Sequence, residues 1–150
     1  MAAETPTLRS AAPLGLLMLA LTLPASANEA GDIRARLEKW TDAFNAGRAE
    51  DVCDLFSREA ISDYRGQPER TYDEICALLK RSLADPSRKF HYELDLRETI
   101  VAGDLAVVRL VWRLSVSPVN VTSTEPGMDV FRKEADGKWR IIRYMAYEAP

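Results

Sequence analysis

Cysteine and histidine, the residue types that most often supply nucleophilic, redox or metal chemistry, are scarce in this chain. There are two cysteines, Cys53 and Cys76, and one histidine, His91. Protein-built zinc and iron sites usually draw three or four ligands from these types, so we expect no metal site and no cofactor. His91 alternates with apolar neighbours and is expected to face outward or into a dimer contact. The sequence also contains no glycine-rich phosphate loop and no Gly-x-Ser-x-Gly motif, which argues against nucleotide binding and serine hydrolysis.

The N-terminus has the features of a secretory signal. An apolar run over residues 11–23 precedes Pro24-Ala25-Ser26-Ala27. The run is too short to span a bilayer, and its end supplies the small-x-small pattern of a signal-peptidase site. We therefore expect residues 1–27 to be removed before Asn28 and the mature chain to be periplasmic or secreted, with no membrane attachment. The alternatives are a retained membrane anchor and a buried core helix.

Export changes the interpretation of the two cysteines. In an oxidising compartment, a pair in the mature chain suggests one disulfide between Cys53 and Cys76. It would close a loop of about two dozen residues and contribute roughly 3 kcal/mol in the chain-entropy model. The alternatives are buried free thiols and a reactive thiol. Neither cysteine has a neighbouring lysine or histidine that would activate it, which disfavours a nucleophile.

Composition excludes several other classes of protein. The 150 residues include 23 acidic and 20 basic side chains, a net charge of −3, and no basic block, so we expect no nucleic-acid partner. A hydrophobic content of 47% with only 7 glycines and 8 prolines excludes disorder and linker composition. Residues 28–150 are enough for one domain and too few for two independent cores.

Helical periodicity dominates the first half of the mature chain. Ile33, Leu37, Trp40 and Phe44 share one face of a helix that we expect Asp32 to cap and Gly47 to end. A second short helix is expected over residues 52–56. A brief strand over 60–65 precedes a turn at Gly66-Gln67-Pro68. Thr71-Tyr72-Asp73-Glu74 is a capping-box sequence that opens a third helix, which Pro86 stops.

A period of two then indicates strands over the rest of the chain. Phe90, Tyr92, Leu94 and Leu96 alternate with polar residues, which predicts one buried and one solvated face. Further strands are expected over 106–117, 123–134 and 139–147, with a hairpin turn at Asp136-Gly137. Helices followed by an antiparallel meander predict an α+β domain in which a curved sheet wraps around three N-terminal helices.

Several of these segments resemble NTF2-like proteins, most closely the SnoaL-like or ketosteroid-isomerase-like kind. Residues 127–132 and 136–144 are similar to the C-terminal hairpin of that family, and residues 40–47 and 55–60 are similar to its opening. The resemblance spans nearly all of residues 30–148. It implies a cone-shaped pocket between the helices and the concave sheet, in a family that includes isomerases, dehydratases and proteins that only bind or assemble.

The resemblance also implies which residues would be catalytic. Steroid isomerases of this family use a tyrosine on the first helix, a carboxylate base on the first strand and a protonated aspartate on a late strand. In this sequence those positions fall on Trp40, Asp63 and Asp129. Asp63 would be the base and Asp129 a neutral hydrogen-bond donor, whereas an indole at position 40 is a poorer oxyanion stabiliser than a phenol. The alternatives are that Asp63 is only a turn residue and that Asp129 forms a structural ion pair with Arg143 or Arg113.

The expected pocket lining consists of aromatic side chains and one cation, which would suit an anionic ligand. These residues are Trp40, Phe44, Tyr64, Trp112, Phe131, Arg143 and Tyr147. We expect the domain to bind a small apolar or weakly acidic molecule. The alternatives are an acid–base enzyme that uses Asp63 and Asp129, and an assembly domain. Val107 and Val111 on the outer face of a strand also favour a homodimer.

Overall fold

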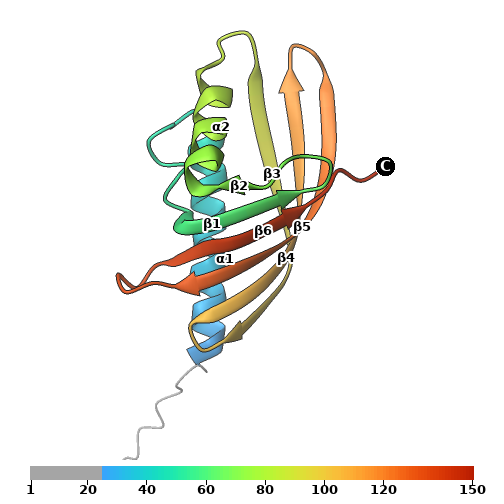
Figure 1. Cartoon of the computed structure of the whole chain (residues 1–150). Helices are drawn as coiled ribbons and strands as arrows, with labels where there is room; N and C mark the ends of the chain where they lie inside the picture. The colour runs from blue at the N-terminus through green and yellow to red at the C-terminus, as the bar shows by residue number, and fades with distance from the viewer. Residues whose placement is uncertain (1–24) are drawn as a thin grey trace, which may run out of the picture.

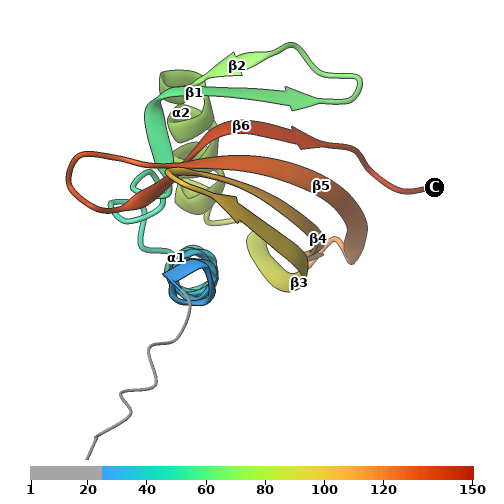
Figure 2. The same ribbon diagram turned by 90° about the horizontal axis from the view of Figure 1, so that it is seen from below.

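The computed structural model describes residues 25–150, and in it one curved six-stranded sheet packs against two helices (Figures 1 and 2). In chain order the elements are α1 (Ala25–Asn45), β1 (Phe56–Tyr64), β2 (Arg70–Thr71), α2 (Tyr72–Ala84), β3 (Lys89–Ala102), β4 (Leu105–Ser117), β5 (Val121–Lys133) and β6 (Trp139–Ala146). The predicted α+β class is confirmed. The predicted signal sequence lies outside the described residues except for its last three positions, and cleavage before Asn28 stays a prediction.

The sheet has the strand order β2-β1-β6-β5-β4-β3. All neighbouring strands are antiparallel except β1 and β6, which pair in parallel. The β1–β6 pairing brings the middle of the chain beside its C-terminal strand. Helix α1 packs mainly on β3, and α2 lies against β1 and β2 (Figure 1). The two helices therefore cover different parts of the concave face.

Helix α1 ends where its sequence predicts, but it begins earlier. The amides of Gly47 and Arg48 donate to the carbonyl oxygens of Phe44 and Ala43, and Gly47 has φ +71°. These are the bonds of a Schellman motif, which favours glycine because of its positive φ. Asp32 is not the cap, since α1 starts at Ala25. Its side chain is exposed within the helix.

Only two of the three expected helices are present in residues 25–150. The segment that was expected to form the second helix, around residues 52–56, forms successive turns before β1. Its backbone bonds run from Asp54 to Asp51 and from Phe56 to Cys53, a spacing of three residues that never extends into an α-helix. The third expected helix is α2, and the Glu74 carboxylate accepts a 2.8 Å hydrogen bond from the Thr71 amide at its start.

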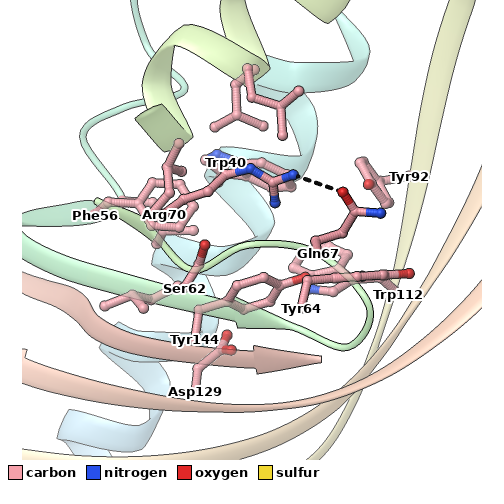
Figure 3. A pocket seen from close by; sticks show the side chains of 15 residues that line it. Trp40, Phe56, Ser62, Tyr64, Gln67, Arg70, Tyr92, Trp112, Asp129 and Tyr144 are labelled. Carbon is pink, nitrogen blue, oxygen red and sulfur yellow. Dashed lines mark hydrogen bonds between the residues drawn. The ribbon is translucent and has the colours of Figure 1, made fainter. Parts of the chain in front are cut away.

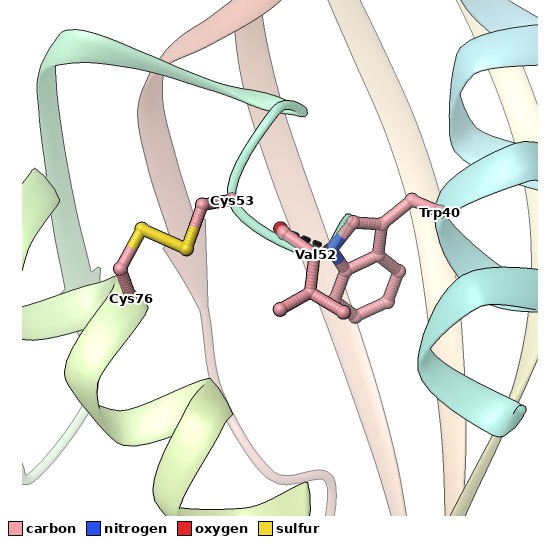
Figure 4. Close-up of a disulfide and its surroundings, with 4 residues drawn as sticks. All are labelled: Trp40, Val52, Cys53 and Cys76. Carbon is pink, nitrogen blue, oxygen red and sulfur yellow. Dashed lines mark hydrogen bonds between the residues drawn. A yellow bond between two sulfur atoms is a disulfide. The ribbon is translucent and has the colours of Figure 1, made fainter. Parts of the chain in front are cut away.

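The predicted disulfide is present and joins this turn segment to α2. Cys53 and Cys76 are bonded, their Cα atoms are 5.6 Å apart, and both residues are buried in the core (Figure 4). The bond therefore fixes α2 to the segment that leads into β1. Within residues 25–150, no helix has the length and apolar character needed to cross a membrane.

Strand β6 contains one extra residue that reverses its alternation. Phe131 of β5 pairs with Ile141, but the preceding residue Val130 pairs with Arg143, so Ile142 has no partner of its own. This is a β-bulge. Before it, Ile141 faces inward; after it, Tyr144 faces inward and Arg143 is exposed. The inner surface of the sheet is therefore different from the one that strict alternation predicts.

Candidate functional site

A cavity of about 290 Å³ lies between the two helices and the concave face of the sheet (Figure 3). Its walls are predominantly apolar. The apolar lining residues are Trp40 of α1, Leu55 and Phe56 at the start of β1, Ile75, Leu78 and Leu79 of α2, Trp112 of β4 and Ile141 of β6. The volume is near the lower end of the range for small-molecule pockets.

Asp129 is the acidic residue in the lining. It is only 1% exposed, and its two carboxyl oxygens have no hydrogen-bond partner in the described part of the chain. Its position in β5 pairs with Val108 on one side and Tyr144 on the other, and neither supplies a bond to it. Burial therefore raises the pKa of Asp129 to about 8, because desolvation penalises the charged form. At neutral pH the group is a carboxylic acid that can donate one hydrogen bond.

Three tyrosines line the same cavity as this acid. Tyr64, Tyr92 and Tyr144 come from β1, β3 and β6 and all line the cavity. Burial raises the pKa of each phenol, so all three are neutral hydroxyl groups. In Figure 3 the ring of Tyr144 lies beside the Asp129 carboxyl group, between it and the other labelled side chains.

A second acid, Glu125, lies on the same strand face as Asp129. It is buried, it accepts a 2.8 Å hydrogen bond from Ser123, and it pairs in register with Trp112, which lines the cavity. Burial raises the pKa of Glu125, although the bond from Ser123 opposes this shift. Glu125 is therefore at the margin of the cavity and already has a partner, unlike Asp129.

Trp40 lines the cavity, but its N–H group is engaged elsewhere. The indole Nε1 donates a 2.9 Å bond to the carbonyl oxygen of Val52 (Figure 4). Its ring packs against Phe44 and Trp112, with centroids 5.2 Å away in both cases. Trp40 therefore supplies apolar surface and anchors the turn segment, and its N–H does not point at a ligand.

The structure does not bring Asp63 and Asp129 together. Asp63 is exposed, whereas its neighbours Ser62 and Tyr64 line the cavity. Adjacent residues of a strand point to opposite faces, so Asp63 lies on the outer side of β1. The expected pairing of a base at 63 with a donor at 129 has no geometric support.

The other expected lining residues divide into two groups. Tyr64 and Trp112 line the cavity, while Phe44 and Phe131 are buried in the core away from it. Arg143 and Tyr147 are exposed. Their assignment to the inner face was wrong because the bulge at Ile142 reverses the alternation, and it also removes Arg143 as a partner for Asp129. Arg113, the other proposed partner, pairs with Asp95 instead, at 3.0 Å.

Several lining residues escaped the sequence analysis. Tyr144 was missed because its parity depends on the bulge in β6. A signal for Ser62 did exist, since it has the same parity as Tyr64 on β1. Gln67 and Arg70 come from the hairpin that joins β1 and β2, where no periodicity applies. A signal for Glu125 did exist, since it has the same parity as Asp129 and Phe131 on one strand.

The lining favours recognition of a ligand by shape and hydrogen bonding. Among the residues the structure describes, no three His, Cys, Asp or Glu side chains gather where they could hold a metal ion. The cavity offers apolar surface, three phenols and one neutral carboxylic acid, and also the polar side chains of Ser62, Gln67 and Arg70.

Comparison with known proteins agrees with this architecture. A conserved protein from Planctomyces limnophilus superposes with a TM-score of 0.73 at 16% identity, covering 83% of this chain and 98% of that one. A putative dehydratase of the NTF2-like family from Streptomyces avermitilis gives 0.70 at 17% identity, with 83% and 98% covered. A ketosteroid isomerase-like protein from Erwinia carotovora atroseptica gives 0.66 at 20%, with 81% and 98% covered.

At these identities the likeness concerns the fold. No curated protein sequence matches the chain. The family model for the SnoaL-like domain matches residues 37–142, a span that runs from the core of α1 to the middle of β6. The chain therefore belongs to the SnoaL-like domain family and has the NTF2-like fold.

Proposed function

We propose that this protein binds a small, predominantly apolar molecule that carries a carbonyl or similar hydrogen-bond acceptor. The observation that supports this is the Asp129 carboxyl group, buried beside an apolar cavity with both oxygens unpartnered. Buried polar groups in folded proteins almost always have a partner. In this proposal an acceptor atom of the ligand supplies the missing bond. Because Asp129 is only 1% exposed, the ring of Tyr144 has to rotate aside for the ligand to reach it.

A ketone and a hydrocarbon of the same shape test this proposal. Trp40 and Trp112 line the cavity, so quenching of tryptophan fluorescence reports binding. We expect 2-acetylnaphthalene to bind about tenfold more tightly than 2-ethylnaphthalene at pH 6.5, a ratio equivalent to one good hydrogen bond. Asp129→Leu should abolish the difference, and Asp129→Asn should retain it, because an amide also donates.

Asp63→Asn is the matched control, since it neutralises an exposed acid of the same sheet, on β1, which β6 separates from the strand of Asp129. It should change neither affinity. Equal affinity of the wild-type protein for the two naphthalenes, or no binding of either, would contradict the proposal. Turnover of a ketone that is lost in Asp129→Asn would instead support the enzyme alternative.

We also propose that the mature protein is exported. The disulfide between two buried cysteines is compatible with an oxidising compartment. The test is the intact mass of the protein recovered from the periplasm or medium of its host, which should correspond to a chain that begins at Asn28. A homodimer that uses the outer sheet face around Val107 and Val111 stays a prediction, to be checked by sedimentation.

A further inference from the structure

The cavity has a second polar end, opposite in character to Asp129. Gln67 and Arg70 both line it from the β1–β2 hairpin. Gln67 is exposed and Arg70 is half-buried, so this hairpin forms the mouth, whereas Asp129 is at the closed end. Arg70 is the cationic residue of the lining.

Arg70 has only a weak partner within the protein. Its Nη2 donates to the Oε1 of Gln67 at 3.3 Å (Figure 3), and within residues 25–150 no carboxylate lies at ion-pair distance from its guanidinium. Nearby Glu74 is occupied by the Thr71 amide at 2.8 Å. Arg58, by contrast, lies over the ring of Tyr72 at 4.3 Å. Arg70 acts on Glu74 only at longer range, where its charge helps to lower the pKa of that carboxyl. It is thus a guanidinium that borders the cavity without a direct ion pair.

The remaining charges define where an anion could bind. Glu125 and Glu148 act on the Tyr64 side, where, together with burial, they raise the pKa of that phenol. An anionic group is therefore disfavoured there and favoured at Arg70. Between the two polar ends lie apolar walls formed by Phe56, Ile75 and Leu79. This distribution matches a molecule with an apolar body and one acidic end.

We propose that the ligand is an anionic amphiphile whose carboxylate or sulfonate is bound by Arg70 at the mouth while its apolar body fills the cavity. This inference rests on the proposed function and adds the ligand's charge and orientation. Arginine suits the role because its planar fork binds a carboxylate through two parallel hydrogen bonds. The bond to Gln67 then holds the fork in place.

The test compares 6-acetyl-2-naphthoate with 6-acetyl-2-naphthamide, which differ only in the charged end. By tryptophan quenching at pH 7 and low salt, the purified wild-type protein should bind the acid about tenfold more tightly than the amide, as expected for one charge-assisted contact. Arg70→Gln should abolish this preference, and Arg70→Lys should restore part of it. Arg65→Gln is the matched control: it removes the same charge from the same hairpin at an exposed position outside the lining, and it should keep the preference within twofold.

Binding of 2-acetylnaphthalene separates the two proposals. If it binds but the wild-type protein does not distinguish acid from amide, or if Arg70→Gln still prefers the acid, the role of Arg70 is overturned and the proposed function stands. If no naphthalene binds at all, both fail. Should Arg70→Gln not fold, the wild-type acid-to-amide ratio and its loss in 0.5 M salt decide the question, because an ion pair at a partly exposed mouth is screened.

Discussion

Asp54 and Asp129 are the same residue type in opposite electrostatic surroundings. Asp54 lies in the turn segment before β1 and contacts three cations: Arg36 at 2.8 Å, Arg140 at 3.0 Å and Lys138 at 3.3 Å. A second nitrogen of Arg36 also donates to the Asp54 carbonyl oxygen. The carboxyl group of Asp129 has no hydrogen-bond partner within the described residues 25–150.

The two environments move the pKa of each acid in opposite directions. Burial alone would raise the pKa of Asp54, but the hydrogen bonds from Arg36 and Arg140 outweigh it and hold the pKa far below its usual range. At Asp129 nothing opposes burial, and the pKa rises to about 8. Asp54 therefore connects α1, the turn segment and β6, whereas Asp129 is a destabilising group that the fold tolerates. Because of this contrast, we assign a structural role to Asp54 and a role in ligand recognition to Asp129.

The largest expected effect is a loss of wild-type stability as pH rises, caused by Asp129. Its folded pKa of about 8 exceeds the unfolded value of about 3.9, so between these values only the folded state holds the proton and rising pH favours unfolding. We expect the free energy of unfolding to fall by about 3.5 kcal/mol between pH 5 and pH 8, at about 1.4 kcal/mol per pH unit until the folded group begins to titrate near pH 8.

Denaturant unfolding at several pH values measures this slope. The titratable groups around the cavity include Tyr144 on β6, Glu125 on the strand of Asp129, Tyr64 on β1 and Tyr92 on β3, and the phenols do not titrate in this range. Asp129→Asn should remove most of the slope, and the remainder is expected from Glu125, whose pKa burial also raises. A slope that survives undiminished in Asp129→Asn would mean that another group causes it.

Loss of the disulfide should destabilise both regions at once. Cys53 is adjacent to Asp54, and Cys76 is adjacent to Ile75 in the cavity wall. The bond spans 23 residues, for which the loop-entropy model gives about 3 kcal/mol. The double variant Cys53→Ala/Cys76→Ala should lose about that much and bind 2-acetylnaphthalene more weakly, since α2 is no longer fixed. Wild-type protein in dithiothreitol should behave like the variant, and full stability in reductant would refute the expectation.

Asp54→Asn should lower stability but leave binding intact. It leaves the Arg36 and Arg140 side chains, 15% and 13% exposed, without this charge partner, and we expect a loss of about 2 kcal/mol at pH 7. Because the folded pKa is lowered, this contribution is present above the unfolded pKa and disappears in acid. Asp51→Asn, which breaks an exposed pair with Arg48, is the control and should cost at most about 0.5 kcal/mol. A twofold or larger change in ligand affinity for Asp54→Asn would break the comparison.

The smallest effect is expected at Asp63, which is exposed to solvent and has neither the cation partners of Asp54 nor the burial of Asp129. Asp63→Asn should shift stability by less than about 0.5 kcal/mol and leave its pH dependence unchanged in thermal unfolding. If instead it abolishes a turnover seen in the wild-type protein, the catalytic role that the family resemblance implies for this residue returns.

Regular elements were predictable from the sequence because each repeats a physical signal. Alternation identified β3 and β4, the Thr71–Glu74 spacing identified the start of α2, and Gly47 marked the end of α1. Two cysteines with an export signal were enough to predict the disulfide. The family resemblance predicted the cavity and drew attention to Asp129. It did not predict that the Asp129 carboxyl group would lack a hydrogen-bond partner.

The parts that failed depend on irregular backbone. The segment around residues 52–56 was expected to be a helix. Its backbone groups instead form hydrogen bonds within turns and with the indole of Trp40, a contact between segments that no local pattern reveals. Arg143 and Tyr147 were misplaced by one extra residue in β6. Arg70 lies in a hairpin, where only the three-dimensional arrangement shows that its side chain reaches the cavity.

The extra residue in β6, Ile142, also determines which side chain of that strand faces Asp129. It places Tyr144, and not Arg143, opposite Asp129. If β5 and β6 paired without the bulge, Phe131 opposite Ile141 would be followed by Val130 opposite Ile142 and Asp129 opposite Arg143. The guanidinium of Arg143 would then face inward, and the solitary acid would become half of an internal ion pair. The bulge therefore keeps the cavity free of an internal counter-charge.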